Sequence, residues 1–353
     1  MIFFKKKTDL LSYSDKSKNS FFNQSMIKLV KFHYKNCLKY KKLLDGLNYN
    51  LNNKKISHIP ALPVSLFKKF DLYSVSQNKI IKILKSSGTS GSNPSKIFLD
   101  SFNAKNQTWV LSKIVGNIIG KKRLPMLIVD QDPKGIDRSS YNARIAAING
   151  FSIFGKNLTY ILDKNNKVNS KQLNNFVKKF GKQKFLIFGF TNLIYEHFLK
   201  SKLNLSKTKN LKNGIIIHGG GWKKLEKKSI SNKIFKKNLK LNYNINKVYN
   251  YYGLIEQTGS IFIECPTCSC FRSSIYSDIF VRDQNLNIIK KNKKKGFLQV
   301  LSLLPTSYPG HSLLTEDIAE LRGDINCKSC GNSKKFIVHG RAKNSEIRGC
   351  ANI

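Results

Sequence analysis

A loop rich in glycine and hydroxyl groups, residues 85–96, most restricts how this chain can fold. It reads Lys-Ser-Ser-Gly-Thr-Ser-Gly-Ser-Asn-Pro-Ser-Lys. An apolar run that predicts a strand precedes it, at Ile80, Ile81, Ile83 and Leu84. Gly88 and Gly91 allow the backbone angles at which successive N–H groups converge on an anion. Further donors are Ser86, Ser87, Thr89, Ser90 and Lys96. The sequence therefore predicts a phosphate-binding loop after a strand.

The spacing of this loop excludes the two commonest phosphate loops. Five residues after Gly88 stands Asn93 rather than glycine, and no Gly-Lys-Ser/Thr follows, so the loop is not of the Walker type. It does not match the dinucleotide fingerprint either. A flexible serine–glycine linker is the alternative, but linkers seldom follow a β-branched strand and end on lysine.

The composition is that of a globular chain of one or two domains. Of the 353 residues, 41% are hydrophobic and 11% aromatic, so disorder is a poor interpretation. The net charge of +43 invites a nucleic-acid-binding hypothesis. However, the excess is nearly all lysine scattered along the chain, whereas arginine, which suits bidentate recognition of phosphate and guanine, is scarce. We therefore favour a solvated basic surface over a nucleic-acid partner.

Neither a membrane span nor a signal peptide is expected. No run approaches the roughly 18 apolar residues that a membrane helix needs. The start, Met-Ile-Phe-Phe-Lys-Lys-Lys, places its charges after the apolar piece, whereas a signal peptide has them before it. We expect a cytoplasmic protein whose seven cysteines are reduced thiols or metal ligands rather than disulfides.

Helical and strand patterns alternate along the chain. Helices are expected at residues 21–47, 100–120, 173–180, 193–199 and 224–239. Strands are expected at residues 124–130, 185–188, 214–217, 248–252 and 296–304. The alternation predicts an α/β fold with a largely parallel sheet covered by helices on both faces, in which ligands gather at the carboxyl ends of the strands. In the first helix we expect a buried Cys37 and a surface His33.

Two turns at strand ends are candidates for a nucleotide site. Gly219, Gly220 and Gly221 let the backbone lie flat against a planar group such as adenine, although a tight turn into the next helix also explains them. The second turn, Tyr251-Tyr-Gly-Leu-Ile-Glu-Gln-Thr-Gly259, joins an aromatic pair and a glycine to the carboxylate of Glu256. Such a turn can stack a base and hold Mg²⁺.

Together these motifs resemble those of the adenylate-forming enzymes, which activate carboxylic acids with ATP. The loop, with Ser-Asn before Pro94 and Ser95 before Lys96, is most similar to that of the acyl-protein synthetases (LuxE type). These are the fatty-acid-activating subunits of bacterial luminescence complexes and their non-luminous relatives, and they are related to phenylacetate-CoA ligases. The resemblance implies the large-domain fold of the adenylate formers. It implies no lid domain, because the sequence ends three residues after Cys350.

The resemblance also implies roles for single residues. The loop would grip the β- and γ-phosphates, Tyr252 would lie beside the adenine with Gly253 in the same motif, and Glu256 would hold Mg²⁺. Asp317 would hold the ribose hydroxyls, and Arg341 of the hinge motif would reach the ribose or a phosphate. Two residues depart from the wider superfamily, Ile255 in place of threonine and Glu316 in place of glycine. Lys96, another lysine or a partner subunit would supply the cation that the lid provides in larger relatives.

By the same resemblance Cys350 is the acyl acceptor. In the family the acylated residue is a cysteine near the carboxyl end, within Glu-x-Arg-Gly-Cys, and Cys350 fits that place. A thiolate suits attack on an acyl-adenylate, and Arg341 and Arg348 would lower the pKa of this thiol. A free thiol on a frayed tail is the alternative.

Two cysteine pairs predict a structural zinc site. Cys265 with Cys268 and Cys327 with Cys330 offer two knuckles, and tetrahedral zinc takes four thiolates in this way. Cys270 is an alternative to Cys268, although the spacing of Cys265 and Cys268 mirrors the other pair better. A set of buried or free thiols is the competing interpretation.

These observations lead to one organisation and one favoured function. We expect an N-terminal helical region, residues 1–60, and an acyl-protein synthetase (AMP-binding) domain, residues 61–353, with a Cys-rich zinc-binding insert at 262–332. The predicted reaction is ATP-dependent activation of a carboxylic acid, by resemblance a long-chain fatty acid, and transfer of the acyl group to a cysteine thiol. The implied cofactors are ATP, Mg²⁺ and Zn²⁺, and the implied partner is an acyl-accepting protein or an acyl-CoA reductase-like subunit.

Two alternatives remain beside it. One is an acyl- or aryl-CoA ligase that uses coenzyme A or a carrier protein as acceptor. The other, of a different class, is a zinc-ribbon protein that binds nucleic acid.

Overall fold

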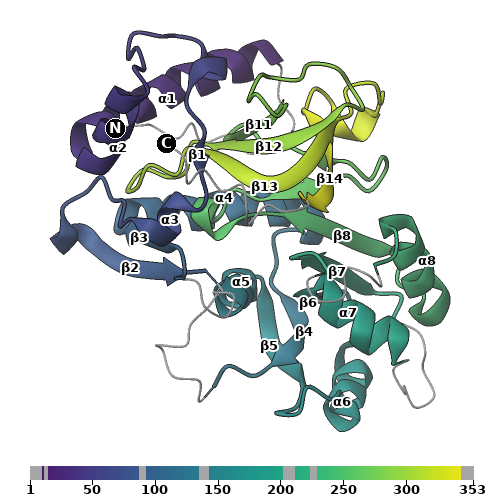
Figure 1. Cartoon of the computed structure of the whole chain (residues 1–353). Helices are drawn as coiled ribbons and strands as arrows, with labels where there is room; N and C mark the ends of the chain where they lie inside the picture. Colours follow the sequence, from purple (N-terminus) through teal and green to yellow (C-terminus); the bar gives the residue numbers. More distant parts are fainter. Residues whose placement is uncertain are drawn as a thin grey trace. The chain divides into compact units, whose positions relative to one another are not determined.

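The computed structural model divides into two compact units (Figure 1). The structure describes residues 10–11, 15–86, 93–134, 143–201, 211–222 and 229–342. The first unit, here called the split unit, comprises Met1–Ile114 and Gly253–Ile353, and the middle unit comprises Val115–Tyr252. The expected boundary after residue 60 stays a prediction. Among the described helices none has the length and apolar content needed to cross a bilayer.

The middle unit is built on a parallel sheet. Its strands are β4 (Leu124–Gln131), β5 (Gly155–Leu162), β6 (Phe185–Phe190), β7 (Gly214–Gly219) and β8 (Lys247–Tyr252), in the order β8-β7-β6-β4-β5. All four neighbouring pairs are parallel. Every residue of β6 and β7 is buried, as expected for strands that are covered on both faces. The predicted α/β fold is confirmed.

Helices alternate with these strands along the chain. They are α5 (Ala143–Ser152), α6 (Ser170–Phe180), α7 (Thr191–Ile194) continuing into a π-helical turn (Tyr195–Lys200), and α8 (Asn232–Tyr243). The helix predicted at 224–239 begins later, because the Ser231 side chain accepts a hydrogen bond from the Ile234 N–H and so caps α8. Strand β5 had not been predicted, since its first half contains the exposed residues Lys156, Asn157 and Leu158 and lacks an apolar run.

The split unit contains a second, largely antiparallel set of strands. They are β9 (Phe262–Glu264), β10 (Phe271–Arg272), β11 (Ser277–Arg282), β12 (Lys295–Ser302), β13 (Ser312–Leu321) and β14 (Lys335–Arg341), in the order β11-β12-β13-β14-β10-β9. The short β1 (Leu62–Pro63) joins β13 in parallel. Of this sheet only the strand at 296–304 had been predicted, and β12 confirms it.

A separate hairpin frames the predicted phosphate loop. Strand β2 (Ile80–Lys85) pairs with β3 (Lys96–Asp100), and the glycine-rich residues lie between them. Helix α4 (Ser101–Ile119) follows β3 directly and ends before Gly120, which has a φ of +88°. The expected strand before the loop and the expected helix at 100–120 are both confirmed. Short 3₁₀ turns complete the described elements at Ile56–His58, Gln77–Lys79, Ile255–Gln257 and Lys328–Cys330.

The first predicted helix is two helices, α1 (Asp15–Asn36) and α2 (Leu38–Gly46). The chain breaks at Cys37, which has extended backbone angles and is buried as expected. The expectation of a surface His33 was wrong, because its side chain is fully buried. Its Nδ1 lies 2.7 Å from the Ser74 hydroxyl and its Nε2 lies 3.0 Å from the Pro305 carbonyl. These partners satisfy the ring, and helical spacing alone could not reveal them.

Candidate functional site

The Glu256 carboxylate lies buried beside one end of the predicted phosphate loop. Glu256 is in the 3₁₀ turn Ile255–Gln257 and only 7% of it is exposed. Burial raises the pKa of this carboxyl group, while a hydrogen bond with the Ser95 side chain and the positive charges of Lys68 and Arg341 act in the opposite direction. An acidic group held in this way beside a hydroxyl is a suitable ligand for a hard cation.

The backbone around Glu256 is fixed by its neighbours. The Tyr308 hydroxyl donates to the Glu256 carbonyl at 2.9 Å. The Gln257 side-chain amide donates to the carbonyls of Val300 at 3.2 Å and Gly310 at 2.8 Å. A Cβ on Gly310 would lie 2.8 Å from the Glu256 carbonyl oxygen, so this position requires glycine. These contacts hold the turn, and with it the carboxylate, in one position.

Ser86 and Ser95 close the neck of the predicted phosphate loop. The Ser86 N–H donates to the Ser95 carbonyl at 3.0 Å, and the Ser95 N–H donates to the Ser86 hydroxyl at 2.8 Å. Lys96 forms an ion pair with Asp71 at 3.2 Å, and both side chains are about half exposed. The other predicted loop residues, Ser87, Gly88, Thr89, Ser90 and Gly91, lie outside the described residues. Through Ser95, the neck therefore lies beside the Glu256 carboxylate.

Two further predicted residues lie opposite each other on β13 and β14. Asp317 and Arg341 are register partners in this antiparallel pair. The Arg341 guanidinium also lies 3.6 Å from the carboxylate of Glu316, the residue that replaces the glycine of the wider superfamily. Because Arg341 lowers the pKa of Glu256, its charge is within electrostatic reach of that carboxylate. Glu256, Asp317 and Arg341 all belong to the split unit, as does Gly253.

The three-glycine turn and Tyr252 belong to the middle unit. Gly219 ends β7, and a Cβ there would lie 2.6 Å from the Tyr251 carbonyl oxygen. Gly220 and Gly221 have φ values of +79° and +66°, which other residues rarely adopt. Tyr252 is the last residue of β8. The glycines are therefore required by the backbone itself, and a bare backbone surface results at the carboxyl end of β7.

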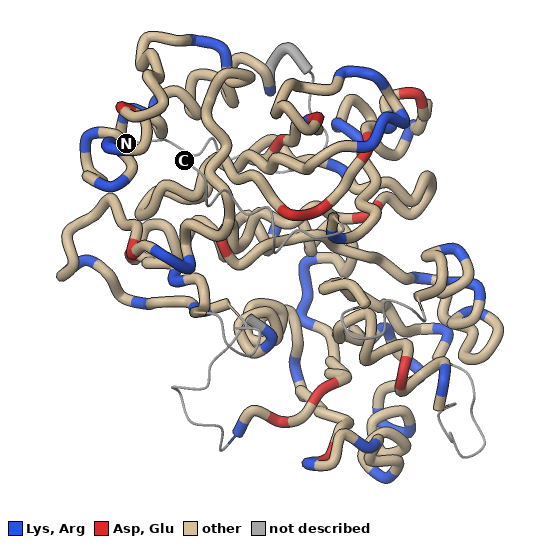
Figure 2. Tube along the Cα trace, viewed as in Figure 1, with Lys and Arg blue, Asp and Glu red and all other residues tan. Residues whose placement is uncertain are grey.

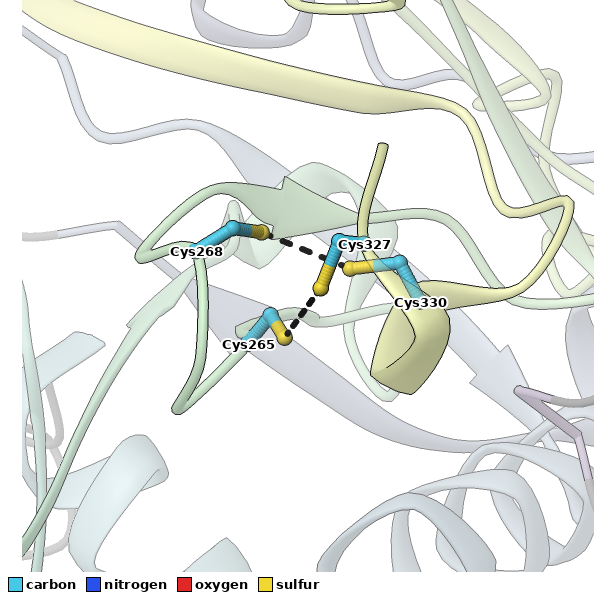
Figure 3. Close-up of side chains that lie close together, drawn as sticks. All are labelled: Cys265, Cys268, Cys327 and Cys330. Carbon is cyan, nitrogen blue, oxygen red and sulfur yellow. Dashed lines mark hydrogen bonds between the residues drawn. The ribbon is translucent and has the colours of Figure 1, made fainter. Parts of the chain in front are cut away.

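Four cysteine side chains from two distant parts of the chain point toward one another (Figure 3). Their sulfur atoms all lie within 4.8 Å of one another, at Cys265, Cys268, Cys327 and Cys330. The Sγ–Sγ distance is 3.8 Å between Cys265 and Cys327 and 3.5 Å between Cys268 and Cys330. Tetrahedral coordination with metal–sulfur bonds of about 2.3 Å needs sulfurs spaced in this way. The cluster can therefore hold a metal ion.

The geometry also distinguishes between Cys268 and Cys270. The Cys270 sulfur lies 3.7 Å from the Cys268 carbonyl oxygen and is not part of the cluster, and burial raises its pKa to about 12. For Cys265, burial raises the pKa, but backbone N–H groups of Cys268 and Thr267 act against it and the pKa is lowered to about 7. A thiol that ionises near neutral pH is suited to bind a metal as thiolate.

Three residues of this site, Ser95, Lys68 and Tyr308, had no predicted role of their own. Ser95 was read only as part of the loop motif, and neither Lys68 nor Tyr308 had been assigned a role. Lys68 follows a proline-containing segment and Tyr308 lies in an irregular connection between β12 and β13. Nothing in their local sequence indicates that they lie near Glu256. Cys350 is outside the described residues, so its role stays a prediction.

Comparisons with known proteins identify the family and the fold. A profile described as acyl-protein synthetase, LuxE, matches residues 3–353. A structure of 2-hydroxyisobutyryl-CoA ligase with an acyl-AMP, in the postadenylation state, is 12% identical to this chain, with a TM-score of 0.69. The match covers 93% of this chain and 68% of the ligase chain. An open conformation of that ligase with acyl-AMP and CoA is 11% identical, with a TM-score of 0.71. This match covers 96% of this chain and 75% of the ligase chain.

A more distant structure has the same fold over part of its length. ATP-bound MatB from Rhodopseudomonas palustris is 12% identical with a TM-score of 0.50, and the match covers 76% of this chain and 49% of MatB. No curated protein sequence matches significantly. The family profile covers nearly the whole sequence and the fold is that of the acyl-CoA ligases, so this chain belongs to the LuxE family of acyl-protein synthetases.

Proposed function

We propose that this protein joins a carboxylic acid to ATP, releasing pyrophosphate, and then transfers the acyl group from AMP to a cysteine thiol. The observation that carries the proposal is the buried Glu256 carboxylate, hydrogen-bonded to Ser95 at the neck of the predicted phosphate loop. The family match supports the same chemistry. The reacting acid is, by family resemblance, a long-chain fatty acid, and we expect the protein to act in the cytoplasm, where ATP and reduced thiols are available.

The proposed roles of the residues are those that the family resemblance implies. Mg²⁺ binds through one or two carboxylates plus substrate phosphates, and Glu256 fits this role because its carboxylate is fixed beside a hydroxyl. When bound, Mg²⁺ would neutralise charge on the departing pyrophosphate. The loop amides and Lys96 would hold the β- and γ-phosphates, Asp317 would hold the ribose, and Arg341 would reach the ribose or a phosphate. By the same resemblance, adenine would lie against the backbone of Gly219–Gly221, and Tyr252 would lie beside it.

In the second step the thiolate of Cys350 would attack the acyl carbon of the adenylate. The bond between that carbon and the AMP oxygen breaks, AMP leaves and a thioester forms. The acyl group could then pass to a partner protein or to an acyl-CoA reductase-like subunit. A specific observation favours a second candidate, since two of the similar solved structures are of a CoA ligase. In that case coenzyme A or a carrier protein, rather than Cys350, is the acceptor.

The cysteine cluster is proposed to hold zinc in a structural role. All four ligands are sulfur, and a closed four-thiolate set without an open position is typical of structural rather than catalytic zinc. The cluster ties the segment after β9 to the 3₁₀ turn before β14, two parts of the split unit that are far apart in sequence.

Carboxylate-dependent ATP–pyrophosphate exchange tests the adenylation step. Wild-type protein should catalyse exchange with at least one acid from a panel of fatty, aromatic and sugar-derived acids. Glu256→Gln, Lys96→Ala and Gly88→Val should each lower the rate by about 100-fold or more, because each removes stabilisation of phosphate charge. Lys82→Ala, an exposed change on β2, serves as the matched control and should leave the rate unchanged. Normal exchange in all three site variants would contradict the proposal.

Acyl transfer is tested with radiolabelled acid and ATP. The protein should acquire a label that hydroxylamine removes, as expected for a thioester. Cys350→Ser should lose this label while retaining pyrophosphate exchange, and Cys270→Ser should keep both. Label that persists in Cys350→Ser, or product that forms only when coenzyme A is added, would instead support the ligase alternative.

A further inference from the structure

A four-residue helix, α3 (Leu66–Lys69), is anchored to the Glu256 turn through Tyr308. Phe67 is 1% exposed, and its ring packs edge-to-face on the Tyr308 ring at 6.2 Å between centroids. The Tyr308 hydroxyl in turn donates to the Glu256 carbonyl at 2.9 Å. Helix α3 also contacts β3, the strand that begins with Lys96 at the end of the predicted phosphate loop (Figure 1). Two independent contacts therefore fix α3 beside the site.

The side chain of Lys68 is exposed, next to the buried Phe67. Its positive charge lowers the pKa of the Glu256 carboxyl group, so the ammonium lies within electrostatic reach of that carboxylate. Within the part of the chain that the structure describes, no hydrogen bond or ion pair engages this ammonium. The other two cations of the site have acidic partners, Lys96 with Asp71 and Arg341 with Glu316. Among the described residues, Lys68 is thus a cation near Glu256 that has no acidic partner.

We propose that the Lys68 ammonium binds the triphosphate of ATP and stabilises the charge that passes to pyrophosphate during adenylation. This inference rests on the proposed function and adds a catalytic cation to it. In that step a carboxylate oxygen of the acid attacks the α-phosphorus, the bond from this phosphorus to the bridging oxygen breaks, and its electron pair leaves with pyrophosphate. A compact ammonium with no competing carboxylate partner suits this oxygen-rich leaving group.

The position on α3 explains why Lys68, and not its neighbour, takes this role. Successive residues of a helix point about 100° apart, so Lys68 and Lys69 leave the helix in different directions. Both are exposed lysines of the same helix, and Lys68 is one of the two cations whose charge lowers the pKa of Glu256 most. Lys69→Ala is therefore a matched control that changes the same charge on the same element.

The test compares Lys68→Ala, Lys68→Arg and Lys69→Ala in pyrophosphate exchange and in equilibrium binding of ATP and AMP. Lys68→Ala should reduce exchange by about 100-fold and weaken ATP binding, while AMP binding is unchanged because AMP lacks the β- and γ-phosphates. Lys68→Arg should recover part of the rate, and Lys69→Ala should behave as wild type. A structural role for Lys68 would instead weaken ATP and AMP binding equally.

Three results would overturn the inference: exchange in Lys68→Ala within twofold of wild type, an equal loss in Lys69→Ala, or equal weakening of ATP and AMP binding. The proposed function fails separately if the wild-type protein catalyses no exchange with any acid. In that case the binding measurements still decide the role of Lys68. A loss confined to ATP would support it, and unchanged ATP binding would exclude it.

Discussion

Two buried imidazole rings, His33 and His311, stack on each other inside the split unit. Their ring centroids are 5.0 Å apart and the rings are nearly parallel, at 13°. His311 Nε2 lies 3.2 Å from the Tyr40 hydroxyl. Burial lowers the pKa of His33 to about 3, and burial together with His33 holds the pKa of His311 well below its ordinary value. Both rings are therefore neutral at pH 7, and charging either one would leave a buried cation.

This pair predicts that the folded state loses stability on acidification. The folded pKa of His33 lies below the unfolded value of 6.5, so between about pH 3 and 6.5 the unfolded chain binds more protons. The stabilisation is complete above pH 6.5 and decreases as the pH falls through this window, by about 2 kcal/mol for His33 between pH 6.5 and 5. Urea unfolding at several pH values measures it. His33→Gln should reduce the slope, and a slope equal to that of wild type would contradict the assignment.

At the residue scale, the sequence was informative where a motif carries chemistry. Glu256 and Arg341 came from motifs, and the structure places both within electrostatic reach of each other. The choice of Cys268 over Cys270 needed coordinates, because both lie within a few residues of Cys265. His33 was misplaced because its partners, Ser74, Pro305 and His311, come from segments far along the chain. Local patterns contain no information about such partners.

At the element scale, prediction succeeded where periodicity is local and strong. The strands β4, β6, β7 and β8 are apolar runs between helical patterns, and all were expected. The antiparallel strands β9, β10, β11, β13 and β14 were missed. Strand β9 has three residues and β10 has two. In β13 buried and half-buried residues do not alternate regularly, and the pairing of β13 with β14 has a register shift. Their pairing depends on long-range register, which alternation along one segment does not specify.

The segments around the cysteine cluster also bind the N-terminal part of the chain. The Ser333 hydroxyl donates to the Leu11 carbonyl at 3.1 Å, and the Ser333 N–H donates to the Cys330 carbonyl at 3.1 Å. Close by, the Ile275 N–H donates to the Leu10 carbonyl at 2.9 Å. The buried Lys18 ammonium donates to the Ser273 hydroxyl at 2.9 Å. The N-terminal segment therefore packs on a surface whose shape depends on the cysteine turns.

Removing the metal should loosen this segment. We expect purified protein to contain about one zinc per chain. Chelation or Cys327→Ser should lower the melting temperature, because the binding free energy of a structural metal contributes to folding. It should also increase hydrogen exchange at residues 10–30 before the middle unit responds. Cys270→Ser, a buried cysteine outside the cluster, is the matched control. Zinc well below one per chain, or no change in exchange on chelation, would remove the site.

At the scale of the whole molecule, the positive charge is distributed rather than concentrated. The chain has 63 Lys and Arg against 20 Asp and Glu, a net charge of +43. Figure 2 shows lysine and arginine on elements of both units, with acidic residues interspersed. Such a surface attracts any polyanion by counterion release, without reading sequence. The charge therefore does not by itself distinguish an enzyme from a nucleic-acid-binding protein.

The dependence of DNA binding on salt and sequence distinguishes them. If the charge is only a solvated surface, labelled DNA duplexes of unrelated sequence should bind equally and dissociate steeply as salt rises from about 50 to 200 mM, because each phosphate contact releases counterions. Fluorescence anisotropy measures the binding of DNA. Glu256→Gln should bind DNA as wild type does, because Glu256 is proposed to act in adenylation and not in DNA binding. Pyrophosphate exchange should continue at salt concentrations where DNA has dissociated. Binding that prefers one sequence at high salt, and that chelation of zinc abolishes, would instead favour the zinc-ribbon interpretation, since base contacts and a folded metal module would then be required.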